Sequence, residues 1–176
     1  LIVTVSYAMR DELIRLDYDE KKIRVIYNGI DPQKYDSNKF SKEEISRFRE
    51  NLGIKAEELM ILFIGRLSWV KGADSLVQAM PMILHEVPNA KLVILGKGDQ
   101  ENMIMHMVTG MELQNKVVLE FKYVSEDERI LHYAASDIAV FPSKYEPFGI
   151  VCTEAMSMGK PVIVGARGTS GLREQV

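Results

Sequence analysis

Short apolar runs recur along the chain and alternate with stretches that have helical spacing. Most of these runs are nearly continuous rather than alternating with polar residues, which is typical of parallel strands covered by helices on both faces. The pattern therefore predicts an α/β fold in three layers, with a parallel sheet between two layers of helices. The seven predicted strands are LIVTVS, IRVIY, LMILFIG, AKLVILG, KVVLEF, DIAVF and PVIVG.

The predicted helices have recognisable ends. Ser41 and Ser125 lie where N-caps belong, and Glu44 and Glu128 follow three residues later, as the partners in capping boxes. Residues 28–41 are rich in turn formers and poor in apolar residues, which favours a linker. We expect helices over residues 8–16, 42–52, 75–86, 100–111, 126–135 and 149–158.

Composition, charge and cysteine content exclude several classes of protein. The 176 residues, 47% of them hydrophobic, suffice for one domain with a substantial core. No apolar run approaches the roughly 18 residues of a membrane span, and LIVTV lacks the basic flank of a signal peptide. We therefore expect a cytoplasmic protein without a transmembrane segment. The net charge of -3 offers no general attraction for nucleic acid, so any anion site must be local. The single cysteine, Cys152, precludes an internal disulfide.

Candidate functional residues gather after the predicted strands. In an open parallel sheet, ligands bind in the crevice beyond the carboxyl ends of the strands. Arg66 and Lys71 follow the third strand together with two glycines, and Glu146 follows the sixth. These residues predict a cationic, glycine-lined cleft with carboxylates on its rim. The four connections expected to open onto this cleft are 65–72, 96–100, 122–127 and 142–149.

The segment YEPFGIVCTE indicates what this cleft binds. A helix is predicted to begin at Gly149, and a helix start offers unpaired N–H groups and about half a positive charge. Gly149, Ile150 and Val151 could therefore receive a phosphate with their backbone alone, and Gly149 lets the phosphate approach closely. Arg66 and Lys71 would close over the remaining oxygens of a diphosphate. Two cations and a helix end would neutralise it, so no metal ion is required.

Two glutamates flank this expected phosphate site. Glu146 and Glu154 could accept hydrogen bonds from hydroxyls on either side of a diphosphate, and a molecule with sugar hydroxyls on both sides is a nucleotide sugar. Glu146 would then face the transferred sugar, and Glu154 the ribose. Two other interpretations remain. Glu154 could be a favourable acid in a first helical turn, or the pair could be a glycosidase acid and nucleophile, although a hydrolase has no use for a phosphate cradle.

Two separated motifs resemble a known family. Their segments are similar to the donor-binding half of a group of glycosyltransferases. These segments are the loop GRLSWVKG at 65–72, LGKGDQE, and YVSEDERILHYAASDIAVFPSKYEPFGIVCTEAMSMGKPVIV. The group is that of the retaining enzymes of the GT-B fold called family 4 or group 1, and their relatives include glycogen and starch synthases. The match extends over most of residues 31–176. It implies a Rossmann-like α/β/α domain that is one half of a GT-B enzyme.

The resemblance assigns roles to individual residues. It implies that Arg66 and Lys71 bind the diphosphate and stabilise charge on the departing nucleotide, that Glu146 contacts the donor sugar, and that Glu154 contacts the ribose. Arg66, Lys71 and Glu146 are the expected catalytic residues, and neither a metal nor another cofactor is implied. The expected donor-binding residues are Gly65, Arg66, Lys71, Gly96, Tyr123, Glu146, Phe148, Gly149, Ile150, Val151 and Glu154.

The resemblance also predicts how the chain is divided. Residues 1–30 look like the end of the family's acceptor-binding domain, and residues 31–176 like the nucleotide-sugar-binding domain, truncated at its C-terminus. The chain opens at Leu1 without an initiator Met and stops within GLREQV, so we expect a piece of a longer protein. The expected partners are a nucleotide-sugar donor and, through the other domain, a hydroxyl acceptor. A glucan synthase is the leading hypothesis, while the base, sugar, acceptor and oligomeric state stay open.

Three other functions remain as alternatives. A nucleotide-sugar epimerase of similar fold would not extend an acceptor, and a non-catalytic nucleotide-sugar-binding module would do no chemistry. An NAD-linked oxidoreductase would require a complete glycine fingerprint. The segment GKGDQE has Glu101 where the third glycine belongs, so a tight turn is the favoured interpretation.

Several other residues are expected to be structural. Cys152 lies near a helix start, but without a nearby histidine we expect a small buried residue rather than a nucleophile. Asp17 and Asp19 have the spacing of metal ligands, yet they belong to the charged run DYDEKK, which favours a solvated loop. Trp69 either packs its loop down or contacts the missing domain or the acceptor.

Overall fold

The seven predicted strands are all present in the computed structural model, which describes residues 1–165 and 168–176. Five of them form one sheet in the order β5-β4-β3-β6-β7, and β1 and β2 pair separately. Every strand pair is parallel, as predicted. The strands are β1 (Ile2–Thr4), β2 (Ile23–Val25), β3 (Leu59–Ile64), β4 (Ala90–Leu95), β5 (Val117–Glu120), β6 (Ile138–Phe141) and β7 (Val162–Val164).

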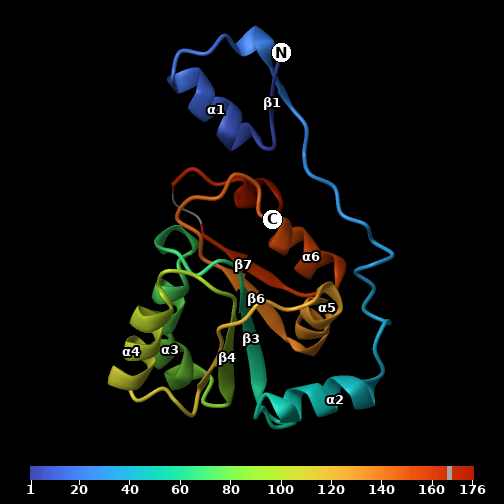
Figure 1. The fold of residues 1–176 in the computed structure, drawn as a ribbon, viewed down its shortest axis with the longest axis vertical. Helices are drawn as coiled ribbons and strands as arrows, with labels where there is room; N and C mark the ends of the chain where they lie inside the picture. Colours follow the sequence, from blue (N-terminus) through green and yellow to red (C-terminus); the bar gives the residue numbers. More distant parts are fainter. Residues whose placement is uncertain (166–167) are drawn as a thin grey trace.

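Helices cover both faces of the larger sheet, which confirms the three-layer prediction (Figure 1). In this view α3 and α4 lie on one side, and α5 and α6 lie on the other, with α2 packed against α5. The helices are α1 (Tyr7–Arg15), α2 (Lys42–Asn51), α3 (Ala73–Glu86), α4 (Glu101–Gly110), α5 (Glu126–Ala135) and α6 (Ile150–Ser157). Short 3₁₀ turns are η1 (Glu20–Lys22), η2 (Trp69–Lys71) and η3 (Gly171–Glu174).

The strand order reverses between β3 and β6. β4 and β5 follow on one side of β3, whereas β6 and β7 lie on its other side. At such a switch point the loops that leave the carboxyl ends diverge and open a crevice where ligands bind. The connections 65–72 and 142–149 leave β3 and β6 at this point, so the fold places the predicted site there.

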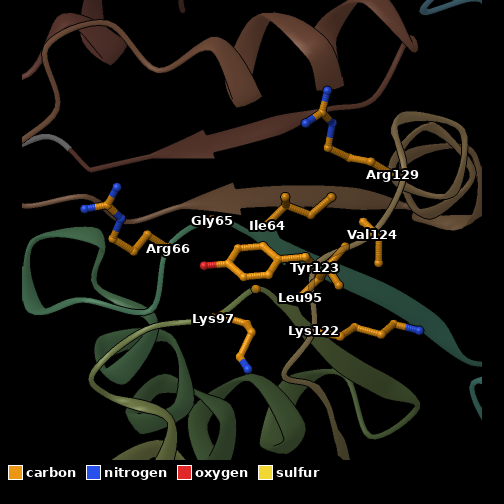
Figure 2. Close-up of a pocket in the computed structure, with 10 residues that line it drawn as sticks. Ile64, Gly65, Arg66, Leu95, Lys97, Lys122, Tyr123, Val124 and Arg129 are labelled. Atoms are coloured by element: carbon orange, nitrogen blue, oxygen red, sulfur yellow. The ribbon is translucent and has the colours of Figure 1, made fainter.

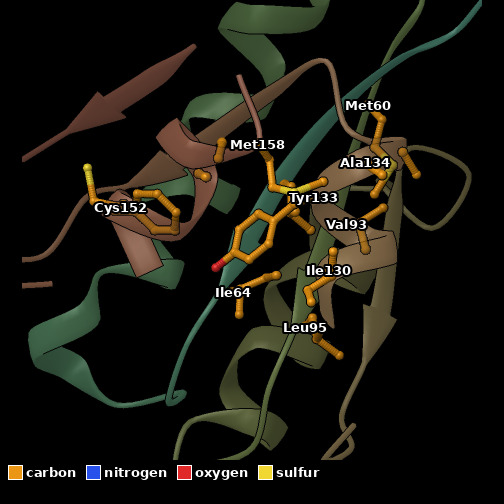
Figure 3. Packing of buried hydrophobic residues seen from close by; sticks show 14 of the residues in the cluster. Met60, Ile64, Val93, Leu95, Ile130, Tyr133, Ala134, Cys152 and Met158 are labelled. Carbon is orange, nitrogen blue, oxygen red and sulfur yellow. The ribbon is translucent and has the colours of Figure 1, made fainter. Parts of the chain in front are cut away.

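Alternate residues of the central strands fill two separate cores. Leu62 of β3 belongs to the cluster under α5 and α6, whereas Phe63 belongs to the cluster under α3 and α4. This division follows from the strand geometry, because successive side chains point to opposite faces. Figure 3 shows the first cluster, in which the ring of Tyr133 from α5 lies among Ile64, Leu95 and Ile130. Because both faces are apolar, the strand sequences show continuous apolar runs rather than an alternating pattern.

The predicted helix caps are confirmed at α2 and only half formed at α5. Ser41 Oγ accepts the N–H of Glu44 at 3.2 Å, and the Glu44 carboxylate accepts the N–H of Ser41 at 2.8 Å. At α5, Ser125 Oγ accepts the N–H of Glu128 at 3.2 Å. The prediction that Glu128 completes a second capping box is wrong, because its carboxylate turns to the ammonium of Lys122, 2.9 Å away.

Residues 28–41 form no helix or strand, as predicted, yet they are attached along their length. Tyr35 is buried, and its backbone carbonyl accepts the hydroxyl of Ser157 in α6 at 3.1 Å. Further along, Lys39 forms an ion pair with Asp127 in α5 at 2.6 Å. The segment therefore runs along the α5 and α6 side of the sheet, as the light-blue stretch of Figure 1 shows.

The N-terminal helix α1 contacts the C-terminal end of the chain. The Glu174 carboxylate, in η3, accepts the N–H groups of Tyr7 and Ala8 at 2.9 and 2.7 Å. It thereby satisfies two of the unpaired donors at the start of α1. Among the described residues, none of the helices combines the length and apolar character that crossing a membrane would need.

Candidate functional site

Two adjoining cavities lie at the carboxyl edge of the sheet. They have volumes of about 240 and 430 Å³, and both are lined by Ile64, Gly65 and Arg66, so they share one wall. The smaller cavity extends over β4 and the loop after β5, and the larger one extends toward the loop after β6. The smaller is also lined by Leu95, Gly96, Lys97, Lys122, Tyr123, Val124 and Arg129, and the larger by Phe63, Ser68, Val70, Lys71, Phe141, Ser143, Glu146 and Val151.

Basic side chains gather in the lining of these cavities although the chain as a whole is acidic. Four basic side chains line the smaller cavity and two line the larger; Arg66 is common to both, so five are distinct, against the single carboxylate of Glu146. Figure 2 shows Arg66, Lys97, Lys122 and Arg129 around the exposed ring of Tyr123. A cleft with one sign of charge concentrates ligands of the opposite sign. Lys122 and Arg129 are each paired with two nearby carboxylates, so the binding of an anion here stays a prediction.

Gly96 holds the two connections at the smaller cavity in close contact. Its φ is 147°, and a Cβ at this position would lie 1.9 Å from the carbonyl oxygen of Gly65. Only glycine permits this approach of the β3 and β4 ends. The predicted donor-binding residues Gly65, Gly96 and Tyr123 thus meet in one cavity, as the positions of the strand ends suggested.

The larger cavity brings the three predicted catalytic residues together. Lys71, at the end of η2, forms an ion pair with Glu146 from the loop after β6, and Arg66 lines the same cavity. The backbone holds Glu146 in place, since its N–H donates to Thr169 O at 3.2 Å and its C=O accepts from Gly171 N–H at 2.8 Å. The cations and the carboxylate therefore face a common space from opposite sides of the switch point.

The start of α6 borders this cavity, as the phosphate hypothesis requires. Gly149 is the N-cap residue, with a φ of 93° and no capping side chain, so the first N–H groups of α6 lack a side-chain acceptor. A Cβ on Gly149 would also lie 2.2 Å from Leu172 Cδ2. Val151 lines the cavity, whereas the side chain of Ile150 is half exposed and Phe148 is buried with its ring 5.9 Å from that of Tyr27.

Glu154 is buried and lines neither cavity, and its expected contact with the ribose stays a prediction. It is 4% exposed, and its carboxylate accepts hydrogen bonds from the hydroxyls of Tyr35 and Tyr133 at 2.6 and 2.8 Å. Arg129 Nη2 lies 3.2 Å from Glu154 Oε1. The alternative that Glu154 merely complements a first helical turn fails, because α6 begins at Ile150 and Glu154 lies beyond the first turn.

The residues around Glu154 were missed by the sequence reasoning. Arg129 and Tyr133 are four residues apart on α5, and this spacing places them on one face of the helix. That spacing was an available signal that they act on a common group. Tyr35 is a large aromatic residue in an otherwise polar linker, which was a second signal. Neither pattern identifies the partner, because Tyr35 and Glu154 are 119 positions apart.

The structure shows where Cys152 and Trp69 lie. Cys152 is buried, and burial raises the pKa of its thiol to about 11, so it is a small core residue rather than an activated nucleophile. Trp69 is largely exposed, and the ammonium of Lys144 lies 4.6 Å from its ring centroid. The prediction that Trp69 contacts the acceptor or another domain stays a prediction.

Comparison with known proteins places the chain in a family. The family model described as "Glycosyl transferases group 1" matches residues 44–176, and that described as "Glycosyltransferase Family 4" matches residues 1–34. An uncharacterized glycosyltransferase of Methanocaldococcus jannaschii is 43% identical over 174 residues, which cover 98% of this chain and 43% of that protein. A glycogen synthase of Mycobacterium tuberculosis is 31% identical over 181 residues, which cover 99% of this chain and 39% of that enzyme.

Solved structures share the fold of the whole chain. The crystal structure of Anabaena HepE in complex with UDP and glucose has a TM-score of 0.87 at 29% identity, and the match covers 100% of this chain and 46% of that one. The complex of the same protein with UDP-glucose gives 0.85 at 28% identity, covering 100% and 47%. The chain therefore spans less than half the length of these relatives. It belongs to the group 1 glycosyltransferases, with the Rossmann-like α/β fold of one half of a GT-B enzyme.

Proposed function

We propose that this chain is the donor-binding part of a retaining glycosyltransferase that transfers a sugar from a nucleoside-diphosphate sugar to a hydroxyl acceptor. One observation carries the proposal: Arg66, Lys71 and Glu146 line a single cavity that extends to Val151 at the start of α6. A diphosphate in this cavity would meet two cations and a helix N-terminus. Glu146 would then accept hydrogen bonds from the sugar that is transferred.

The arrangement suits the charge that develops during the reaction. When a nucleoside diphosphate departs, negative charge increases on its phosphate oxygens while the sugar becomes cation-like. Preorganised cations and N–H groups aimed at those oxygens stabilise the transition state more than the ground state. Arg66 and Lys71 supply the cations, so we propose that the diphosphate is neutralised without a metal ion or another cofactor.

A diphosphate that enters the cavity has to compete with an existing ion pair. Lys71 and Glu146 are paired with each other, so a diphosphate must attract the ammonium away from the carboxylate or share it. A diphosphate carries more charge than one carboxylate, and the Lys71 side chain is 27% exposed, so it is able to turn toward the ligand. Glu146 would at the same moment become free to receive sugar hydroxyls.

The identity of the acceptor is a finer proposal. We favour a glucan acceptor, because a glycogen synthase is among the relatives, and ADP-glucose or UDP-glucose as the donor. The acceptor would bind to the domain of which residues 1–30 form the end, and we propose that the enzyme acts in the cytoplasm. UDP bound to Anabaena HepE supports a nucleotide-sugar donor without deciding the base for this chain.

Product analysis on the full-length protein tests the function. The protein is incubated with UDP-, ADP- and GDP-linked glucose and mannose and with malto-oligosaccharide acceptors, and products are followed by mass spectrometry. A transferase extends an acceptor and releases the nucleoside diphosphate. An epimerase of similar fold instead releases nucleotide without extending an acceptor, and a binding module yields no product. Either of these two results would reject the proposal.

A pair of arginine variants makes the test specific for the site. Arg66→Ala should lower kcat/KM by about 10²- to 10³-fold, the effect typical of losing one donor to a developing oxyanion. Arg47→Ala removes an exposed arginine of α2 far from both cavities and should leave the rate unchanged. Equal rates for wild type and Arg66→Ala would remove the cavity from the mechanism.

A further inference from the structure

The two loops that carry the predicted catalytic residues touch each other at the switch point. They are the β3 loop (65–72) and the β6 loop (142–149). The N–H of Lys144, in the β6 loop, donates to Val70 O in the β3 loop at 2.8 Å, and the N–H of Tyr145 donates to the same oxygen at 3.5 Å. Because both contacts meet at one backbone oxygen, side-chain contacts are needed to fix the angle between the two loops.

Two ion pairs join the loops in opposite directions. Lys71 of the β3 loop reaches Glu146 of the β6 loop. Lys144 of the β6 loop reaches Asp74, which lies in the first turn of α3 directly after the β3 loop, and Lys144 Nζ is 3.2 Å from Asp74 Oδ2. In the proposed function the first pair is given up or shared when a diphosphate enters the cavity. The second pair then remains to hold the loops together.

The pair of Lys144 with Asp74 is placed where a ligand would not disturb it. Neither residue lines either cavity. The ammonium of Lys144 also lies 4.6 Å from the ring centroid of Trp69, so it contacts the β3 loop as well as α3. The Asp74 side chain is only 15% exposed, and its Oδ1 is buried without a hydrogen-bond partner among the described residues. Lys144 is therefore the group that compensates the charge of this carboxylate.

We propose that Lys144 is a positioning residue, whose pair with Asp74 keeps the β3 and β6 loops together once Lys71 has turned to the diphosphate. This inference rests on the proposed donor function. In the ligand-free protein the Lys71 pair shares this task, whereas in the donor-bound protein the Lys144 pair performs it alone. A residue that stabilises the bound state more than the free state lowers Kd, whereas one that stabilises both equally changes only the stability of the fold.

Calorimetric titration of the full-length protein measures this difference. UDP, ADP and GDP are titrated first, and the tightest of the three is used for every variant. Lys144→Met keeps an unbranched side chain over Trp69 but removes the charge, and it should raise Kd by about threefold to tenfold. Lys144→Arg keeps a cation that can pair with Asp74, so it should restore most of the affinity.

Asp74→Ala separates the positioning role from a simple effect of charge. Removing a positive charge near the cleft would by itself weaken the binding of an anion, and removing a negative charge would strengthen it. The two explanations therefore predict opposite signs for Asp74→Ala. Its Kd should rise by about threefold to tenfold if the pair holds the loops, because the contact with Lys144 is lost. A lower Kd in Asp74→Ala, or wild-type values in both variants, would overturn the inference and leave the proposed function standing.

A matched lysine variant serves as the control. Lys39 also forms an ion pair between two separate segments, with Asp127 at 2.6 Å, and it lines neither cavity. Lys39→Met should therefore leave Kd unchanged, and a rise equal to that of Lys144→Met would also overturn the inference. If none of the three diphosphates binds the wild type, the proposed function itself fails and the inference fails with it.

Discussion

Glu146 and Glu154 belong to one short motif and are almost equally buried, at 7% and 4% exposed, but their surroundings differ. Glu146 faces an open cavity and has one charged partner, Lys71, whose side chain reaches solvent. Glu154 accepts hydrogen bonds from Tyr35 and Tyr133, forms an ion pair with Arg129, and lines neither cavity. Burial alone therefore does not distinguish a carboxylate that can exchange its partner from one that is held in place.

The difference indicates that the two carboxylates have different roles. A carboxylate with a single mobile partner can release it when a ligand arrives, because the lost interaction is replaced at once. A carboxylate bound by several donors is preorganised and loses little orientation entropy when a ligand adds one more contact. In the proposed function, the loop around Glu146 would therefore meet the reacting sugar and phosphates, whereas the network around Glu154 would keep its geometry.

The largest expected effect is on activity at the Glu146 side. Lys71→Ala should raise the barrier for transfer by about 3 to 4 kcal/mol, because one donor to the departing diphosphate is lost. Stability should change by less than about 1 kcal/mol, since the Lys71–Glu146 pair is partly open to solvent. Steady-state kinetics and urea unfolding of the same preparation measure both. Lys34→Ala, which breaks an exposed pair with Glu126, is the control and should affect neither.

The second effect is on stability, and it should be larger at Glu154 than at Glu146. Glu154→Gln should lower the free energy of unfolding by about 3 kcal/mol, because the amide nitrogen cannot accept from a tyrosine hydroxyl and Arg129 loses its counter-ion. Glu146→Gln should lower it by less than about 1 kcal/mol, because Lys71 can turn to water. Denaturant unfolding of the two variants under identical conditions gives the difference. Equal losses would show that the two environments are not distinct.

Gly149 lies between the two glutamates and supports both. Gly149→Ala forces a residue with a Cβ to a φ of 93° and against Leu172, so it should cost about 1 to 3 kcal/mol of stability. Gly110→Ala provides the matched control, since a Cβ at this last residue of α4 meets nothing within 4 Å. It should be neutral or stabilise by up to about 1 kcal/mol. Thermal unfolding that ranks the two in the opposite order would contradict this account.

The smallest effect is a pH dependence at the Glu154 side. Burial and the Glu154 hydrogen bond raise the pKa of Tyr35 from 10.0 to about 12, so the folded state favours the protonated phenol. Its contribution to stability is complete below pH 10 and is lost as the pH rises through about 12. Wild type should therefore lose stability more steeply than Tyr35→Phe across this range, as measured by chemical unfolding at successive pH values. Identical slopes would exclude a role for this phenol.

The sequence by itself determined the layers of the fold and one side of the site. Apolar runs and helical spacing are properties of neighbouring residues, so all seven strands could be predicted from them. Arg66, Lys71 and Glu146 could be assigned to one cleft because each lies just after a strand, and parallel strands end at a common edge. A helix starting near Gly149 followed from the same local pattern.

Only the tertiary structure decided the other side of the site. The contact of Tyr35 with Glu154 joins positions 119 apart, and it depends on the path that the linker takes past α5 and α6. The pairing of Lys71 with Glu146 likewise depends on how two loops meet at the switch point. Local spacing determines which face of an element a residue occupies. Which donor meets a buried carboxylate depends instead on how separate elements pack, and no local pattern records that.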